Sequence, residues 1–260
     1  MSFKEWFGLE GKRALVTGAS RGLGREMALA LAAAGADIII TGRTRATLDV
    51  TCAEIEALGR KAIGVEADMA TAPACEAACE AILAEHGPVD ILINNVGNRI
   101  ASMPIQEETL ATWQQSLDMN LTSCFLGTKI FGAAMLARGT GGRIINIASM
   151  SGLIANRGIG GRDYETGKAA VIHFTRCAAA DWAPHGVTVN AICPGLFMTD
   201  TNRGWNERRP DVIEAIVAHI PLGRAGNPPE IGPLAVYLAS PSASYVTGAA
   251  YVIDGGYTLW

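Results

Sequence analysis

Tyr164 and Lys168 are the two residues of this sequence whose types and spacing most directly suggest catalysis. Residues four apart lie on the same face of a helix, so the phenol and the ammonium can meet at one site. A free phenol has a pKa of about 10, and lowering it to about 7 takes roughly 4 kcal/mol of stabilisation of the phenolate. A neighbouring cation can supply part of that stabilisation, so the pair predicts a tyrosine that acts as an acid or a base.

A glycine-rich segment near the N-terminus predicts a binding site for a dinucleotide. It reads Thr17-Gly-Ala-Ser-Arg-Gly-Leu-Gly24 and stands between an apolar strand and the first long helix. One glycine allows a sharp turn, another lets the backbone approach a pyrophosphate, and a third lets helix and strand pack closely. The helix N-terminus then offers free N–H groups and a partial positive charge to the anion. The glycine spacing is G-x-x-x-G-x-G, which differs from the common pattern G-x-G-x-x-G.

Short β-branched runs alternate with alanine-rich segments of helical length along most of the chain. The expected strands are 13–17, 37–41, 62–65, 89–93, 142–147, 187–192 and 250–253, and the expected helices are 22–34, 46–58, 73–85, a long helix through Trp113 and Phe131, and 164–182. Strands that are apolar throughout belong to a parallel sheet that is covered on both faces. The alternation therefore predicts an α/β fold: a Rossmann-type, doubly wound parallel sheet of about seven strands in three layers.

We expect residues 1–260 to form a single domain that carries both the dinucleotide site and the catalytic residues. The segment from about 199 to 227 interrupts the alternation and contains Trp205, Pro210 and Pro221. Ligands of doubly wound folds bind at the carboxyl ends of the strands, and this segment follows the sixth strand. It is therefore expected to be a small irregular insertion that covers the substrate as a lid.

Taken together, these motifs resemble the short-chain dehydrogenase/reductase family over nearly the whole chain. The family's motifs are matched by the glycine-rich segment, by Asn94-Asn-Val-Gly97 after the fourth strand, with Val96 in place of alanine, and by Tyr164-Glu-Thr-Gly-Lys168. The resemblance implies an enzyme that moves a hydride between a nicotinamide dinucleotide and a carbonyl or secondary alcohol. It also implies a set of cofactor-binding residues: Gly18, Ser20, Arg21, Gly22, Leu23, Gly24, Arg43, Asp68, Met69, Asn95, Gly97, Tyr164, Lys168, Pro194, Gly195 and Thr199.

The same resemblance gives roles to four catalytic residues. Tyr164 transfers the proton, and Ser149 hydrogen-bonds the carbonyl or alkoxide oxygen of the substrate. Lys168 binds the nicotinamide ribose and lowers the pKa of Tyr164, while Asn120 bends its helix and extends the proton relay. Ser151 is the competing hydroxyl, and Ser149 is preferred because its spacing to the next glycine matches family sequences.

The end of the second strand bears on the choice of dinucleotide. Members of the family that use NAD place an acidic side chain there, which accepts hydrogen bonds from the ribose hydroxyls. Gly42 holds the matching position and cannot do this, whereas Arg43 follows it and Arg21 lies in the glycine-rich segment. Two guanidiniums at these sites resemble the arrangement that grips a 2′-phosphate. The sequence therefore favours NADP as the cofactor, and NAD stays open.

The substrate is less well defined, because the chain resembles a bacterial branch of gluconate 5-dehydrogenases, sugar dehydrogenases and 3-oxoacyl-carrier-protein reductases. We expect a sugar acid, a polyol or another small oxo or hydroxy compound, with a 3-oxoacyl thioester as the alternative. The wall between Gly152 and Tyr164 is slightly longer than in many relatives. Arginines in or near this wall could hold a carboxylate by two parallel hydrogen bonds, although a structural role is the simpler interpretation. Candidate substrate contacts are Ser151, Arg157, Arg162 and Trp205, with Arg99 beside them.

Two other classes of protein fit the motifs less well. A dinucleotide sensor without catalysis would keep the glycines but has no use for Asn120, Ser149, Tyr164 and Lys168 together. An epimerase or dehydratase of the extended family shares the tyrosine–lysine pair, but such chains normally carry a larger C-terminal substrate domain. Only the short insertion at 199–227 is present here.

Composition argues against several further functions. A net charge of −4 provides no basic field for nucleic acid or an anionic membrane, and no apolar run is long enough to span a bilayer. Cys75 and Cys79 have no histidine or third cysteine beside them, so we expect unpaired thiols rather than a metal site. Free thiols favour a cytoplasmic location. A monomer would expose the C-terminal Trp260, and the family resemblance implies a homo-tetramer that buries it.

Overall fold

The computed structural model describes residues 2–100, 102–156 and 160–260. Its centre is a sheet of seven parallel strands in the order β3-β2-β1-β4-β5-β6-β7. The strands are β1 (Arg13–Val16), β2 (Asp37–Gly42), β3 (Ala62–Glu66), β4 (Ile91–Asn94), β5 (Gly142–Ile147), β6 (Val187–Pro194) and β7 (Ala250–Ile253). The expected doubly wound sheet is confirmed. Because the chain builds outward from β1 to β3 and then returns to β4, the strand order reverses between β1 and β4, where such folds bind ligands.

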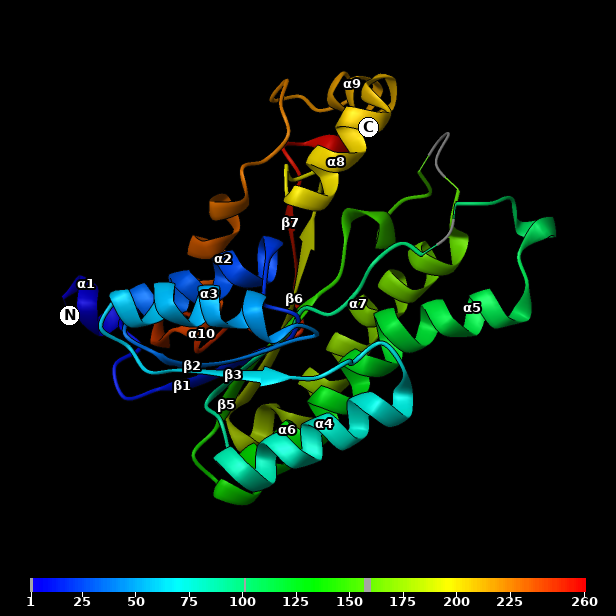
Figure 1. Cartoon of the computed structure of the whole chain (residues 1–260). Coiled ribbons are helices and arrows are strands. Elements are labelled where there is room, and N and C mark those ends of the chain that lie inside the picture. The colour runs from blue at the N-terminus through cyan, green and yellow to red at the C-terminus, as the bar shows by residue number, and fades with distance from the viewer. Residues whose placement is uncertain (1, 101, 157–159) are drawn as a thin grey trace.

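Helices cover both faces of the sheet. They are α1 (Phe3–Phe7), α2 (Gly22–Ala33), α3 (Arg45–Ala57), α4 (Ala72–His86), α5 (Leu110–Leu117), α6 (Ser123–Arg138), α7 (Arg162–Trp182), α8 (Asp200–Arg208), α9 (Pro210–Val217) and α10 (Gly232–Ala239). Helices α2, α3 and α10 pack on one face, and α4, α6 and α7 pack on the other, so the fold has the three expected layers (Figure 1).

Neighbouring residues of β1 show why the strands are apolar throughout. Successive side chains of a strand point to opposite faces of the sheet. Val16 belongs to the core under α2, where it joins Met27, whereas Leu15 belongs to the core under α6, where it joins Phe131. All four side chains are fully buried. Because both faces are covered, every position of the strand needs an apolar side chain.

The long helix expected through Trp113 and Phe131 is divided by one turn of π-helix. Helix α5 runs into Asp118–Thr122, which has π geometry, and α6 continues from Ser123. A π turn takes up one extra residue and changes the direction in which the following side chains point. Asn120, the residue expected to bend this helix, lies within the turn.

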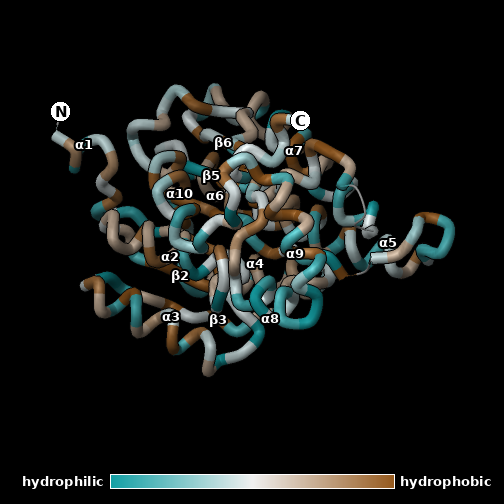
Figure 2. The backbone as a smooth tube through the Cα atoms, turned by 90° about the horizontal axis from the view of Figure 1, so that it is seen from above, coloured by the Kyte–Doolittle hydropathy of each residue, from teal (hydrophilic) through white to brown (hydrophobic). Residues whose placement is uncertain are grey.

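The segment after β6 is more regular than the sequence suggests. The expected irregular insertion at 199–227 contains α8 and α9, and a bridge between Phe197 and Gly226 closes its base. The residues of α8 are mostly hydrophilic, as Figure 2 shows. Apolar side chains of α9, Ile213 and Ile216, pack against the chain that leaves β6 in a small separate core. The two helices therefore form a compact flap beside the strand ends.

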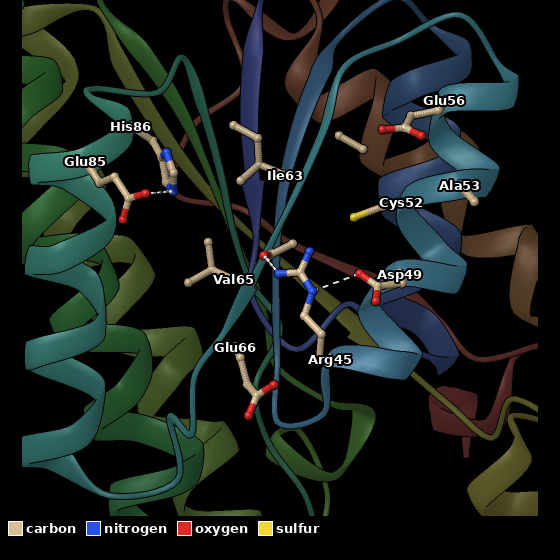
Figure 3. A pocket seen from close by; sticks show the side chains of 12 residues that line it. Arg45, Asp49, Cys52, Ala53, Glu56, Ile63, Val65, Glu66, Glu85 and His86 are labelled. Atoms are coloured by element: carbon tan, nitrogen blue, oxygen red, sulfur yellow. Dashed lines mark hydrogen bonds and ion pairs between the residues drawn. The ribbon is translucent and has the colours of Figure 1, made fainter.

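The edge strand β3 is protected by charged side chains. Arg45 donates a hydrogen bond to the Gly64 carbonyl at 2.8 Å and pairs with Asp49 at 2.9 Å. These residues line a hollow of about 610 Å³ beside the strand, as Figure 3 shows. Charged groups on an edge strand prevent another strand from pairing with it. No candidate functional residue lines this hollow, so we assign it this protective role.

Two features are absent from the residues that the structure describes. No helix among them is long and apolar enough to cross a membrane. Across the same residues, no group of three or more histidine, cysteine or acidic side chains could hold a metal ion. All six cysteines are free thiols; Cys177 is exposed, and the other five, including Cys75 and Cys79, are buried.

Candidate active site

The glycine-rich segment forms a tight loop between β1 and α2, at the carboxyl edge of the sheet. Gly18 and Gly22 have φ angles of 63° and 60°, in the left-handed region that favours glycine. Gly24 lies in the first turn of α2, where an added Cβ would come within 2.6 Å of the Gly18 carbonyl oxygen. The glycines thus allow helix and loop to close on one another, as their spacing predicts.

Side chains from β2 and from the loop after β4 hold this loop in place. The Thr41 hydroxyl accepts a hydrogen bond from the Gly18 amide at 3.0 Å. The Asn95 side-chain nitrogen donates to the carbonyl oxygens of Thr17 and Gly18, each at 3.0 Å. Asn95, one of the expected cofactor-binding residues, thus uses its side-chain nitrogen to hold the shape of this loop.

The start of α2 suits the pyrophosphate of a dinucleotide. Arg21 is the N-cap residue of this helix, and its side chain makes no capping hydrogen bond. The first N–H groups of a helix have no partner within the helix, so they can bind an anion. An added Cβ at Gly22 would lie 3.7 Å from the Thr199 methyl group, which places the segment after β6 against this loop. The start of α2, with its glycine backbone and its unpaired N–H groups, therefore fits a pyrophosphate.

The remaining candidates for cofactor contacts surround this loop. Met69 is buried, with its sulfur 3.3 Å from the Thr41 hydroxyl, and Leu23 packs against the core. Met69 therefore lies in the interior, and Leu23 is half-buried. Asp68 is exposed, and its Oδ1 accepts a hydrogen bond from the Ala70 amide at 3.1 Å. The others range from exposed to buried along the strand ends: Ser20, Arg21, Arg43, Gly97, Pro194 and Gly195.

Lys168 and Asn120 converge behind the loop that follows β4. The Lys168 ammonium is buried and donates a hydrogen bond to the Ile147 carbonyl at 2.8 Å. The Asn120 side chain donates to the Asn98 carbonyl at 2.9 Å and accepts from the Asn98 amide at 3.0 Å. An added Cβ at Gly97 would lie 2.7 Å from the Lys168 ammonium and 2.8 Å from the Asn120 oxygen. Glycine at position 97 therefore leaves both polar groups room to meet.

The two candidate serines have different surroundings. Ser149 follows β5 and accepts a hydrogen bond from the Ser151 amide at 3.1 Å, and its hydroxyl interacts with the Tyr164 phenol. The Ser151 hydroxyl instead accepts a hydrogen bond from the Asn156 side chain at 2.9 Å. Ser149 is thus the serine whose hydroxyl can act together with Tyr164, and Ser151 belongs to a neighbouring network.

Comparisons with known proteins agree with this geometry. A family model described as enoyl-(acyl carrier protein) reductase matches residues 18–258. The chain is 43% identical to galactitol 2-dehydrogenase (L-tagatose-forming) from Cereibacter sphaeroides over 100% of both chains. It is 40% identical to 2-dehydro-3-deoxy-D-gluconate 5-dehydrogenase from Pseudoalteromonas atlantica, over 97% of this chain and 98% of that one. The NADP-bound structure of a 3-oxoacyl (acyl-carrier-protein) reductase from Agrobacterium tumefaciens superposes with a TM-score of 0.91, at 32% identity, over 99% and 98% of the two chains.

The chain belongs to the short-chain dehydrogenase/reductase family. It is accordingly an NAD(P)-dependent oxidoreductase that acts on CH–OH groups or the corresponding carbonyls.

The electrostatics of this short-chain dehydrogenase/reductase site are dominated by burial. Burial raises the pKa of the Tyr164 phenol, and the Ser149 hydroxyl and the Arg99 charge lower it only in part. Burial also lowers the pKa of Lys168 to about 8. The Lys168 nitrogen lies 5.8 Å from the centroid of the tyrosine ring. The expected lowering of the Tyr164 pKa by Lys168 is therefore not found in the chain by itself, because desolvation of the phenolate outweighs the nearby charges.

Two of the three arginines considered for holding a substrate carboxylate, Arg99 and Arg162, are paired within the protein. Arg162 pairs with the buried Glu165 carboxylate at 2.5 Å, and Arg99 lies 3.8 Å from the same carboxylate. Arg157, the third candidate, lies outside the described residues. Arg99 and Arg162 therefore have structural partners, and the simpler interpretation of these arginines applies to both.

Trp205 and Glu165 both make contacts within the protein. Trp205, expected to contact substrate, packs in the small core of the flap with Leu196 and Ile213. Sequence reasoning missed Glu165, which lies beside Tyr164 and accepts hydrogen bonds from the backbone and side chain of Asn156. Its position inside the tyrosine–lysine motif was the only available signal, since burial of a carboxylate cannot be read from one sequence.

Proposed function

We propose that the chain reduces small oxo compounds, or oxidises the matching alcohols, with NADP(H) as its cofactor and Tyr164 as its acid/base. When bound, the nicotinamide dinucleotide supplies or accepts the hydride. The observation that carries this proposal is that Tyr164, Ser149, Lys168 and Asn120 gather around the loop that follows β4. A binding protein without catalysis has no use for these four groups at one place.

Each of the four residues has a distinct role in the proposal. Tyr164 gives a proton to the substrate oxygen or takes one from it, and Ser149 donates a hydrogen bond to that oxygen. Lys168 binds the ribose hydroxyls and adds a positive charge beside the phenol. Asn120 fixes the loop after β4 through Asn98 and extends the path for the proton.

Replacing the phenol tests this assignment. Tyr164→Phe should lower turnover by at least about 100-fold, the usual effect of losing a general acid or base. The ring stays in place, so cofactor affinity and thermal unfolding should match the wild type. Turnover close to that of the wild type would remove Tyr164 from the mechanism.

NADP is the proposed cofactor because two exposed arginines flank the loop. Arg21 ends the glycine-rich loop and Arg43 follows β2, and the two segments are joined by the hydrogen bond from the Gly18 amide to Thr41. Guanidiniums hold a phosphate through paired hydrogen bonds. The related Agrobacterium tumefaciens reductase has NADP bound.

We propose a neutral polyol or sugar as the preferred substrate class, ahead of a sugar acid. Among the described residues, Arg99 and Arg162 are both paired with Glu165, so neither offers a free guanidinium to a carboxylate. The galactitol 2-dehydrogenase matches this chain over its full length. The sugar acid stays the second candidate because the gluconate-type relative is almost as similar.

A substrate panel separates these candidates. Galactitol, gluconate and a 3-hydroxyacyl thioester should be compared with NADP⁺ and with NAD⁺, by the absorbance of the reduced cofactor. We expect the highest kcat/KM for the polyol with NADP⁺. A preference for gluconate would overturn the neutral substrate class, and a preference for the thioester would favour acyl reduction instead.

We also propose that the flap acts as a substrate lid on a single-domain subunit, and that four subunits assemble in the cytoplasm. Helices α8 and α9 stand beside the strand ends, on a segment closed at its base by Phe197 and Gly226. Leu259 and Trp260 are more than 70% exposed, and Tyr245 is fully exposed. A second copy of the chain would cover these groups. A monomeric mass in light scattering would contradict the assembly.

A further inference from the structure

A buried carboxylate, Glu165, lies next to Tyr164 at the start of α7. Its side chain is only 8% exposed, and it accepts hydrogen bonds from Asn156 at 3.2 Å (backbone) and 2.8 Å (side chain). Arg162 pairs with it at 2.5 Å. A buried charge is strongly unfavourable unless partners compensate it, and this one has several. Glu165 is therefore a fixed negative group within reach of the catalytic tyrosine.

Arg99 reaches the same place from the loop that follows β4. Its Nη2 lies 3.8 Å from a Glu165 oxygen, and its Nη1 donates hydrogen bonds to the carbonyl oxygens of Gly160 and Gly161. Gly161 is the N-cap of α7 and has a left-handed conformation, with φ of 91°. The guanidinium thus ties the loop after β4 to the turn from which α7, and Tyr164 with it, begins.

The guanidinium also lies over the tyrosine ring. Its central carbon is 4.7 Å from the ring centroid of Tyr164, within the range of a cation–π contact. The Lys168 nitrogen is farther away, at 5.8 Å from the same centroid. Arg99 is therefore the nearer of these two cations to the phenol ring.

We propose that Arg99 is a positioning residue for Tyr164: held by Glu165 and two glycine carbonyls, its guanidinium orients the phenol ring and stabilises the ionised phenol. The inference rests on the proposed acid/base role of Tyr164. The charged groups that face the ring come from two elements, Arg99 from the loop after β4 and Glu165 and Lys168 from α7. Burial raises the pKa of Tyr164, and the Arg99 charge acts in the opposite direction, so the geometry and the charge agree.

The pH dependence of alcohol oxidation tests this role. Oxidation needs the ionised phenol, so turnover at saturating substrate rises as pH passes through the pKa of Tyr164. Arg99→Met should move this rise upward by about half to one pH unit, because the variant loses a positive charge that favours the phenolate over the neutral phenol. Arg99→Lys keeps the charge without the planar stack, so its profile should lie between those of Arg99→Met and the wild type.

A direct titration of the phenol provides a second measurement. The difference absorbance of tyrosinate, with Tyr164→Phe subtracted, should show the same upward shift for Arg99→Met without any substrate. If Arg99→Met is too unstable to purify, the Arg99→Lys enzyme carries the test, with a smaller upward shift expected in both measurements.

Three results would overturn the proposal. A fall in turnover at every pH with no shift of the profile would mean that Arg99 only supports the fold. A loss confined to anionic substrates would make it a substrate contact. An unshifted tyrosinate titration would show that the charge of Arg99 does not affect ionisation of the Tyr164 phenol. Failure of the proposed function looks different, because Tyr164→Phe would then keep its turnover whatever Arg99 does.

Discussion

The side-chain nitrogen of Asn95 lies 3.0 Å from the carbonyl oxygen of Gly18, and this hydrogen bond joins the loop after β4 to the glycine-rich loop after β1. A second bond from the same nitrogen reaches the Thr17 carbonyl at 3.0 Å. The backbone amide of Asn95 also donates to the Thr17 hydroxyl at 2.9 Å. The two loops flank the point where the strand order reverses, and Asn95 fixes one loop against the other.

Asn95→Ala should therefore weaken cofactor binding more than it slows the chemical step. It leaves two backbone carbonyl oxygens without their donor, a change that costs about 1–3 kcal/mol when such groups are buried. We expect the Kd for NADPH in calorimetry to rise by about tenfold or more, since 1.4 kcal/mol is a factor of ten. Asn98→Ala is the matched control, because the Asn98 side chain makes no hydrogen bond among the described residues. Equal Kd values for the two variants would contradict this role of Asn95.

Replacement of Gly152 or of Gly204 by alanine should have opposite effects on the free energy of unfolding. An added Cβ at Gly152 would come within 2.7 Å of the Lys168 carbonyl carbon and 2.8 Å of the Ala169 amide nitrogen, both backbone atoms of α7. Gly152→Ala should lower the free energy of unfolding by about 1–3 kcal/mol, as overpacking does. Gly204 lies within α8 with nothing near its added Cβ, so Gly204→Ala should stabilise by about 0.5–1 kcal/mol. Denaturant unfolding of both variants checks the signs, and a stable Gly152→Ala enzyme would show that α7 can move away.

Arg43 should govern the preference between the two dinucleotides. Removing its guanidinium takes away one partner of the proposed 2′-phosphate, which NADH does not carry. Arg43→Ala should raise the KM for NADPH by about tenfold, the effect of losing a charged hydrogen bond of roughly 1.5 kcal/mol, and leave the KM for NADH nearly unchanged. Steady-state kinetics with both cofactors measure this. A wild-type enzyme that already uses NADH as well as NADPH would contradict the phosphate-binding role.

The strands and the glycine-rich loop were predictable because local pattern alone determines them. A run such as Asp37-Ile-Ile-Ile-Thr41 has only one stable place, a strand covered on both faces, and the spacing of Gly18, Gly22 and Gly24 follows from the turn they form. The sequence alone indicated only part of the role of Gly42. Its lack of an acidic side chain is plain from the sequence, but an added Cβ there would lie 2.9 Å from the Ser20 Cβ. An aspartate introduced at position 42 would therefore need Ser20 to move first.

The features that the sequence could not predict depend on contacts between distant segments. The helix α8 has few apolar residues, so it carries no periodic pattern, and it forms beside α9 over a core that includes Leu196. The partners of Glu165 are Arg99 and Asn156, which lie outside its helix, and Arg162 within it. The sequence alone does not show that Arg99, Arg162 and Glu165 meet. Only the fold brings the three charged side chains together and shows that both arginines are already paired with Glu165.

A pair of carboxyl groups near the site predicts an unusual dependence of stability on pH. Asp163 is fully buried, and neither of its carboxylate oxygens has a hydrogen-bond partner among the described residues. Burial raises the pKa of Glu108, and the nearby charge of Asp163 raises it further. A proton on Glu108 can supply the donor that Asp163 lacks. Folding therefore raises the pKa of Glu108 above its value in the unfolded chain, which fixes the sign of the effect.

Because the pKa of Glu108 is raised in the folded state, its contribution to stability is complete below its ordinary value of 4.5 and is lost as pH rises through the raised pKa. Glu108→Gln keeps a hydrogen-bond donor for Asp163 at every pH, so its stability relative to the wild type should increase as pH rises from that value toward neutrality. The free energy of unfolding by denaturant, measured for both proteins across this range, checks the trend. Glu107→Gln is the matched control, since the neighbouring Glu107 is exposed and should change the trend little. A difference between Glu108→Gln and wild type that stays constant with pH would mean that protonation of Glu108 does not stabilise the fold.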